Sequence, residues 1–185
     1  ISNKMNKIKV AINGFGRIGR TFLRVALLRE DIEIVAIHDL ADIQTMAHLF
    51  KYDSVHGKWK DEVIAEGGHI RIGQLSIPFF QNIKEEFPWG KLGVEVLVES
   101  TGTCKTFEHC TKHLNAGAKR VIMSAPPEDD SVKTIVLSIN EQLIENTDVV
   151  LSNASCSTNS AAHMIQLIDE LCEIESCYIT TVHSY

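Results

Sequence analysis

The stretch "INGFGRIGR", Ile12 to Arg20, decides the fold because it places three glycines between a strand pattern and a helix pattern. Residues 8–13 form a β-rich run, and apolar residues recur at helical spacing after the glycines. Gly14, Gly16 and Gly19 form the motif G-x-G-x-x-G. In such a turn the first glycine permits a tight bend, the second lets a pyrophosphate approach the backbone, and the third lets helix and strand pack closely. This stretch therefore predicts dinucleotide binding.

Asp39 strengthens the prediction because it ends the next strand pattern, residues 32–39, 20 residues after Gly19. A carboxylate at this place accepts hydrogen bonds from the ribose hydroxyls of the adenosine half and repels a 2′-phosphate. Leu40 beside it offers such a phosphate no partner. We therefore expect NAD rather than NADP as the cofactor. The alternative, a simple strand-to-helix turn without a ligand, does not account for the placement of Asp39.

Three arginines follow or lie within the glycine turn. Arg17 lies inside the turn, where it could contact the pyrophosphate. For Arg20 and Arg24 the helical spacing indicates a solvated helix face without a functional role.

Beyond the turn, strand patterns alternate with helix patterns. This order predicts an α/β fold, a doubly wound and mostly parallel sheet covered on both faces. We expect a Rossmann NAD-binding domain over 7–155 and the start of a second, α+β catalytic domain over 156–185, with the remainder absent. Further strands are expected at 94–100, 119–126, 133–140, 148–155 and 176–185, a strand meander at 57–81, and helices at 17–30, 42–52, 106–118 and 157–173.

Composition narrows the classes of function. The 185 residues carry a net charge of −6, which gives no electrostatic footprint for nucleic acid or an anionic membrane. No apolar run approaches the roughly 18 residues of a membrane span. The five cysteines, an odd number without a leader sequence, indicate free thiols and a cytoplasmic location. Cys172 and Cys177 are expected in the core.

A second group of metal-type ligands lies in the region 104–113. It comprises Cys104, His109, Cys110 and His113, with the two histidines four residues apart on one predicted helix. A structural zinc site needs a second, spaced pair of ligands, and the sequence offers none. The pattern therefore favours a surface helix, and we expect no metal.

Cys156 stands among small and polar residues in "SNASCSTNS", where a helix can begin. The positive end of a helix dipole favours thiolate over thiol. Ser152 or Ser155 can cap this helix. His183 follows 27 residues later, and a strand–helix–strand crossover could bring it beside the cysteine. A nucleophile with its base and an incidental thiol both remain compatible with this spacing.

Six sequence blocks together resemble phosphorylating glyceraldehyde-3-phosphate dehydrogenase. They occur in the family's order from about Lys7 to Tyr185, and family chains are nearly twice as long. The blocks are "INGFGRIGR", "KYDSVHG", "VESTG", "SAP", "SNASCSTN" and "TTVHSY". The resemblance implies an NAD-dependent enzyme that converts glyceraldehyde 3-phosphate and inorganic phosphate to 1,3-bisphosphoglycerate. It also implies a homotetramer.

The resemblance assigns roles residue by residue. It implies that Cys156 attacks the aldehyde to form a thiohemiacetal and that His183 takes its proton, before phosphate releases the thioester. It implies that the hydroxyls of Ser155 and Ser157 help to bind that phosphate. It implies cofactor contacts at Asn13, Gly14, Gly16, Arg17, Ile18, Asp39, Thr101, Gly102 and Ser124.

The chain departs from the family pattern at three positions. Ser157 and Ser160 stand where the family usually has threonine and cysteine, and Ser138 stands where it often has glycine. Two alternative functions remain. Erythrose-4-phosphate dehydrogenase shares the blocks and releases a free acid, whereas the chain alone could be an NAD-binding fragment without turnover.

Overall fold

The structure is a computed structural model that describes residues 6–81 and 87–183. Within these residues a nine-stranded sheet forms the centre of the molecule. In spatial order its strands are β10 (Lys133–Thr134), β11 (Val150–Ser152), β9 (Arg120–Met123), β8 (Val96–Glu99), β1 (Ile8–Asn13), β2 (Ile32–Asp39), β7 (Leu75–Gln81), β6 (His69–Ile72) and β5 (Val63–Glu66). A separate hairpin pairs β3 (Tyr52–Asp53) with β4 (Gly57–Lys58).

The sheet topology confirms the predicted doubly wound class. Within the nine-stranded sheet the neighbouring strands from β10 through β7 pair in parallel, and β5, β6 and β7 pair antiparallel. The order β7-β2-β1-β8-β9-β11 corresponds to the order 3-2-1-4-5-6 of dinucleotide-binding sheets. β1 is central, and the chain switches direction between β1 and β8. In such sheets ligands bind beyond the carboxyl ends of the strands at this switch point.

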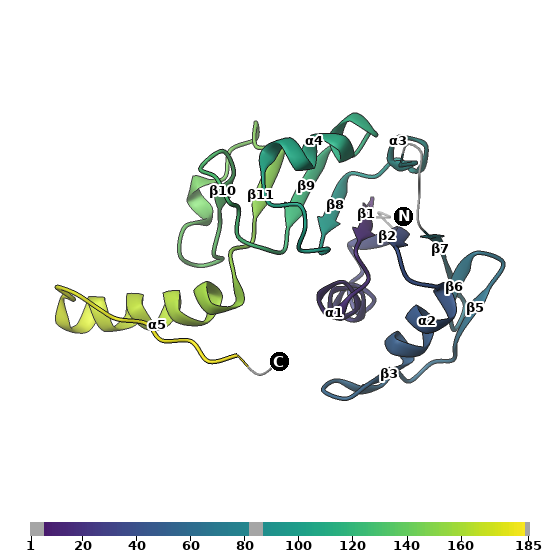
Figure 1. Ribbon diagram of the computed structural model, residues 1–185, viewed down its shortest axis with the longest axis horizontal. Coiled ribbons are helices and arrows are strands. Elements are labelled where there is room, and N and C mark those ends of the chain that lie inside the picture. The colour runs from purple at the N-terminus through teal and green to yellow at the C-terminus, as the bar shows by residue number, and fades with distance from the viewer. Residues whose placement is uncertain (1–5, 82–86, 184–185) are drawn as a thin grey trace, which may run out of the picture.

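Helices cover both faces of the sheet (Figure 1). The helices are α1 (Arg17–Ala26), α2 (Ile43–Lys51), α3 (Trp89–Leu92), α4 (Phe107–Asn115) and α5 (Cys156–Cys172), with a 3-10 turn, η1, at Glu141–Leu143. One core cluster combines α1 and α2 with one face of the sheet, including Ile12, Leu23 and Phe50. The other lies under α3 and α4 on the opposite face and includes Trp89 and Leu97.

Most of the predicted elements are confirmed, several with their ends. The strand at 32–39 is observed with these bounds, and Asp42 caps α2 by accepting a hydrogen bond from the Thr45 N–H at 2.8 Å. The segment 57–81 is a meander of short strands. Gly117, which follows α4, has φ +100°, the left-handed backbone that favours glycine. The short α3 and η1 were not predicted.

The C-terminal part differs from its prediction. A strand was expected at 176–185. Residues 173–183 form no strand, and residues 184 and 185 lie outside the described part of the chain. Instead this segment runs back alongside α5, from the outer end of the helix toward the rest of the molecule, and adds nothing to the sheet (Figure 1). A strand needs a hydrogen-bonding neighbour, and no described strand lies there. Of the strand expected at 133–140, only Lys133–Thr134 pairs.

α5 has the expected helical pattern, but none of its residues is buried. Met164, Ile168 and Leu171 are 58%, 50% and 75% exposed. Cys172 and Cys177 are exposed as well, so the expectation that they belong to the core is wrong. The apolar stripe of α5 finds no covering layer within residues 6–81 and 87–183.

Arg24 also differs from its prediction, because it is buried rather than solvated. Its guanidinium donates to the carbonyl oxygens of Phe50 at 2.7 Å and Gly57 at 3.0 Å and lies over the rings of Phe50 and Trp59. Arg20 donates to the carbonyl oxygen of Phe15 at 2.9 Å. Both side chains therefore fix the packing of α1, which helical periodicity alone does not reveal.

In the part of the chain that the structure describes, every helix is too short or too polar to cross a lipid bilayer.

Candidate functional site

A cavity of about 450 Å³ opens at the carboxyl edge of the sheet, where a dinucleotide is expected. Most of its walls come from residues that end or directly follow β1, β2 and β8. The lining residues are Asn13, Gly14, Gly16, His38, Asp39, Leu40, Phe87, Ser100, Thr101, Thr103 and Lys112. We refer to this space as the cofactor cavity.

The glycine turn has the steric properties that its motif predicts. Gly14 has φ +91°, and an added Cβ there would lie 2.6 Å from the Thr101 amide nitrogen. A Cβ on Gly19 would collide with the carbonyl oxygen of Gly14. Gly16 differs, because a Cβ there would meet nothing within 4 Å. Since Gly16 lines the cavity at the start of α1, its missing side chain leaves space for a ligand rather than for protein packing.

α1 begins without a side-chain cap and without an acidic residue in its first turn. Its N–H groups therefore remain available, together with the positive end of the helix dipole, to an anionic group. Asp39 lies beside the glycine turn, and its carboxylate accepts hydrogen bonds from the backbone N–H of Phe15 at 2.5 Å and of Ala41 at 2.9 Å. These two bonds fix the orientation of the carboxylate. This arrangement fits the diphosphate and ribose of NAD.

Glu99 is the centre of a buried hydrogen-bond network directly beneath this cavity. It is 2% exposed and ends β8. One carboxylate oxygen accepts from the backbone N–H of Thr101 at 2.9 Å and from its hydroxyl. The other accepts from the Asn13 side-chain amide and from His113 Nε2 at 3.2 Å. Burial opposes ionisation, but the hydrogen bonds from His113, Thr101 and Asn13 hold the pKa of Glu99 below its usual range.

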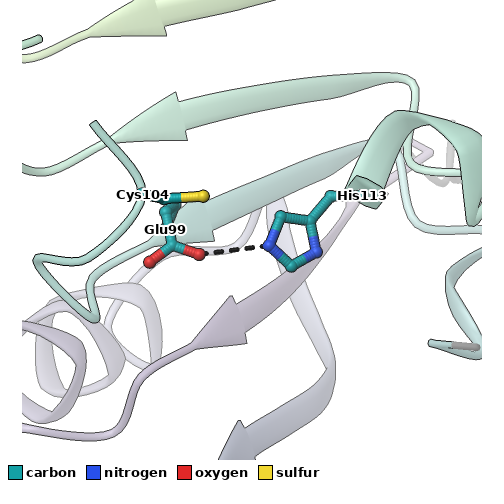
Figure 2. A group of neighbouring side chains, drawn as sticks. All are labelled: Glu99, Cys104 and His113. Carbon is teal, nitrogen blue, oxygen red and sulfur yellow. Dashed lines mark hydrogen bonds and ion pairs between the residues drawn. The ribbon is translucent and has the colours of Figure 1, made fainter. Parts of the chain in front are cut away.

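Glu99, Cys104 and His113 offer one ligand atom each within 4.8 Å of one another, so they need testing as a metal site. Figure 2 shows the three side chains facing a common point, with the Glu99–His113 bond drawn. Trp89 Nε1 donates to His113 Nδ1 at 3.1 Å. Because Nδ1 accepts, the single proton of a neutral ring is on Nε2, the atom that faces Glu99.

These hydrogen bonds do not fit a metal. A cation at His113 Nε2 would displace the proton there and leave the ring without any, or break the Trp89 bond. Cys104 Sγ donates to the His109 carbonyl oxygen at 3.2 Å, although hydrogen bonds from Cys110 and His113 lower the pKa of its thiol to about 5. Burial lowers the pKa of His113, whereas Cys104 and Glu99 raise it. The net effect is a pKa above the usual value of histidine. The Trp89 N–H nevertheless keeps the ring neutral in this arrangement.

The expectation of a surface helix at 104–113 is therefore only partly right. Cys104, Cys110 and His113 are buried, whereas His109 is exposed. The sequence pattern did not indicate that Glu99 joins them. Spacing along one helix does not reveal which of its faces the sheet covers.

Cys156 and His183 line a second cavity, of about 390 Å³, which we call the thiol cavity. Cys156 is the first residue of α5 and is exposed. His183 comes from the C-terminal segment that runs back along α5 (Figure 1). The remaining lining includes Ser157, Ser160 and Thr181. The fold thus gathers the thiol and the imidazole on one cavity although 27 residues separate them.

The backbone around Cys156 is fixed on its N-terminal side. Ser155 caps α5 by accepting a hydrogen bond from the Thr158 N–H at 3.0 Å. The Asn159 side chain donates to the carbonyl oxygens of Asn153 at 2.7 Å and Ser155 at 3.0 Å. Ala154 has φ +58° and is buried. These contacts attach the first turn of α5 to the end of β11.

Of the other residues predicted to contact the cofactor, some line the cofactor cavity and some do not. Asn13 and Thr101 line it, although their side chains are committed to Glu99. Four more lie on the adjoining turns without being among its described lining residues. These are Arg17 and Ile18 at the start of α1, Gly102 with φ +75°, and Ser124 after β9.

Sequence reasoning missed several residues that line the cofactor cavity. Ser100 donates to the Gly14 carbonyl oxygen at 2.6 Å and so ties β8 to the glycine turn. His38 was identifiable because it directly precedes Asp39, the last residue of β2. Phe87 and Lys112 come from elsewhere in the chain, and no local pattern indicates that they reach this edge.

The fold, the glycine turn and Asp39 define a dinucleotide-binding domain. The family model described as "Glyceraldehyde 3-phosphate dehydrogenase, NAD binding domain" matches residues 8–107. The chain belongs to this family, and the cofactor of its domain is NAD.

Curated relatives extend the match along nearly the whole chain. Glyceraldehyde-3-phosphate dehydrogenase of Geobacillus stearothermophilus is 46% identical over 180 residues, covering 96% of this chain and 53% of the relative. The chromosomal enzyme of Cupriavidus necator is 46% identical over 182 residues, and enzyme 1 of Kluyveromyces lactis 43% over 179; each match covers 96% of this chain and 54% of the relative. The chain spans about half the length of the curated relatives it matches.

Proposed function

We propose that the complete protein is a phosphorylating glyceraldehyde-3-phosphate dehydrogenase, which converts glyceraldehyde 3-phosphate, inorganic phosphate and NAD to 1,3-bisphosphoglycerate and NADH. The observation that carries the proposal is the pair Cys156 and His183 on one cavity, in a chain of this family. The exposed thiol stands at the start of α5 and is open to a substrate.

The chain's own residues perform the covalent and proton-transfer chemistry. The Cys156 sulfur bonds to the aldehyde carbon, and the proton of the thiol passes to the carbonyl oxygen, which becomes the hydroxyl of a thiohemiacetal. The His183 imidazole takes the proton of this hydroxyl as the carbon is oxidised. When bound, NAD accepts the hydride that leaves this carbon. Inorganic phosphate then attacks the thioester, which releases the acyl phosphate and the Cys156 sulfur, and the sulfur takes back the proton that His183 holds.

The hydroxyl groups near the thiol have different surroundings. Ser157 lines the thiol cavity and is available to an anion. Ser155 is engaged with Thr158, through its cap and through a hydroxyl contact at 2.8 Å. We assign phosphate binding to both, with Ser157 contributing more. Within the same proposal the enzyme is cytoplasmic and homotetrameric, and the chain alone has no turnover because relatives are about twice its length.

The experiment measures NADH formation by the complete protein with glyceraldehyde 3-phosphate, with and without inorganic phosphate. We expect phosphate-dependent turnover, and a loss of at least roughly 1,000-fold in kcat for Cys156→Ser, with NAD affinity retained. Ser160→Ala is the matched control, one helical turn further along the same cavity. Equal turnover without phosphate would instead support an erythrose-4-phosphate dehydrogenase, which releases a free acid.

A further inference from the structure

Phe87 and Leu40 are the large apolar side chains among the described residues that line the cofactor cavity. The other lining residues are polar or are glycines. Leu40 is 73% exposed and Phe87 is half-buried, so the fold leaves part of each residue accessible. An accessible aromatic residue in a mostly polar cavity indicates contact with a flat, less polar part of the ligand.

Neighbouring rings hold Phe87 in place. The Trp89 ring lies 5.1 Å from it between centroids and within 9° of parallel, and the His113 ring lies 4.8 Å away. Trp89 and His113 are both fully buried and are joined by a hydrogen bond. His38 packs edge-on against Phe87, with ring centroids 5.1 Å apart. A ring held in this way is in position before a ligand arrives, so contact with it costs little side-chain entropy.

The position of Phe87 indicates which half of NAD it meets. In the sheet order, β2 and β7 lie on one side of β1, while β8, β9 and β11 lie on the other. Cys156 follows β11, so the nicotinamide that reacts beside it belongs to the second side and the adenosine to the first. Phe87 contacts His38, which precedes Asp39 at the end of β2, and therefore belongs to the adenosine side. The ribose and phosphates of this half are strongly polar, which leaves the adenine base as the flat group that suits the ring.

We propose that Phe87 is a cofactor-binding residue whose ring forms a wall of the adenine subsite, so that the base of NAD packs against it. Every base has a π-face that packs favourably on an aromatic side chain. The two-ring adenine can cover more of Phe87 than a one-ring pyrimidine can, so the contact also favours adenine. This proposal rests on the NAD binding of the proposed function and gives the base a contact that Asp39, which is assigned to the ribose, does not supply.

The test compares NAD with nicotinamide cytosine dinucleotide, in which a one-ring base replaces adenine. Calorimetry on the complete protein measures the dissociation constants of both for the wild type, Phe87→Ala and Phe87→Leu. We expect the wild type to bind NAD roughly tenfold more tightly than the analogue, and Phe87→Ala to reduce this ratio to within about threefold. NAD itself should bind to Phe87→Ala roughly tenfold more weakly than to the wild type. Phe87→Leu should give an intermediate ratio, because leucine keeps apolar contact but has no flat face.

Phe107→Ala is the matched control, because Phe107 is 37% exposed at the start of α4 and is not among the described lining residues of the cofactor cavity. It should keep the wild-type ratio. Equal wild-type affinity for the two dinucleotides, or an unchanged ratio in both Phe87 variants, would overturn the role of Phe87 alone. Absence of NAD binding by the wild type would overturn the proposed function as well. Because leucine still packs on Trp89, Phe87→Leu decides the question if Phe87→Ala does not fold.

Discussion

The two candidate cavities differ in how much of their structure the described residues supply. Beneath the cofactor cavity, Glu99, Asn13 and His113 are buried and linked by hydrogen bonds. At the thiol cavity, Cys156 is exposed, and α5 has no buried residue. The cofactor cavity is thus supported by the protein interior on one side, while the thiol cavity has fixed backbone on one side only.

This difference shows that the two cavities depend on different parts of the protein. Residues that hold the cofactor cavity also hold the fold, so their substitution should change stability and binding together. Cys156 contributes no burial, so its substitution should change the chemistry alone. The predictions below test this division, beginning with the largest expected effect.

Gly19→Ala should unfold or strongly destabilise the protein, because the new Cβ collides with the Gly14 carbonyl oxygen. We expect a loss of about 3 kcal/mol or more in the free energy of unfolding, with loss of NAD binding. Gly16→Ala is the matched control, because its Cβ meets nothing. It should cost under about 1 kcal/mol of stability yet weaken NAD binding more than tenfold. Urea unfolding and NAD titration measure both, and equal stability of the two variants would contradict the packing role of Gly19.

Glu99→Gln should destabilise the fold by about 3 kcal/mol, because the new amide N–H₂ would face donors that now meet a carboxylate. Glu128→Gln serves as control: this carboxylate is 60% exposed and pairs with Lys105 at the surface. The control should change the unfolding free energy by less than about 0.5 kcal/mol. The network would lose its assigned importance if urea unfolding gave the two variants the same stability.

The burial of His38 predicts a pH dependence of stability. Because burial lowers the pKa of His38 in the folded state, the unfolded chain binds a proton at higher pH than the folded chain does. This contribution is complete above the ordinary histidine pKa of about 6.5 and is lost as pH falls below it. Urea midpoints of wild type and His38→Gln at pH 7.5 and 5.5 should therefore show the larger loss in the wild type. An equal or smaller loss in the wild type would contradict a neutral His38.

Ser138→Gly should stabilise the protein slightly, because Ser138 has φ +67°, a backbone conformation that costs a side chain energy. We expect a gain of about 0.5 kcal/mol, after the greater freedom of glycine in the unfolded chain is subtracted. Ser76→Gly, in the extended strand β7, should instead destabilise. Thermal unfolding distinguishes the two, and a destabilised Ser138→Gly variant would refute the strain argument.

The fold was predictable from local patterns to a large extent. The strand at 32–39, the Asp42 cap and the glycine turn each follow from a few neighbouring residues. The expected strand at 176–185 was wrong for its described part because pairing depends on a distant neighbour, which strand propensity does not supply. The burial of Arg24 was likewise missed, because its partners Phe50 and Gly57 lie far along the chain.

The site residues were predictable only where a single residue has a recognisable chemical role at a recognisable place in the sequence. The glycines, Asp39, Cys156 and His183 have recognisable positions in the sequence. The network around Glu99 does not, because Asn13 and Glu99 are 86 residues apart and meet only when β1 and β8 pair.

The attachment of α5 to β11 has a consequence for motion. Asn159 and Ser155 fix the first turn, whereas the other end of the helix, at Cys172, is exposed. Fraying of this helix should therefore begin at its C-terminal end and stop short of the first turn, so that amide hydrogen exchange slows from Cys172 toward Asn159. The sulfur then keeps its place relative to the sheet even while most of its own helix opens and closes.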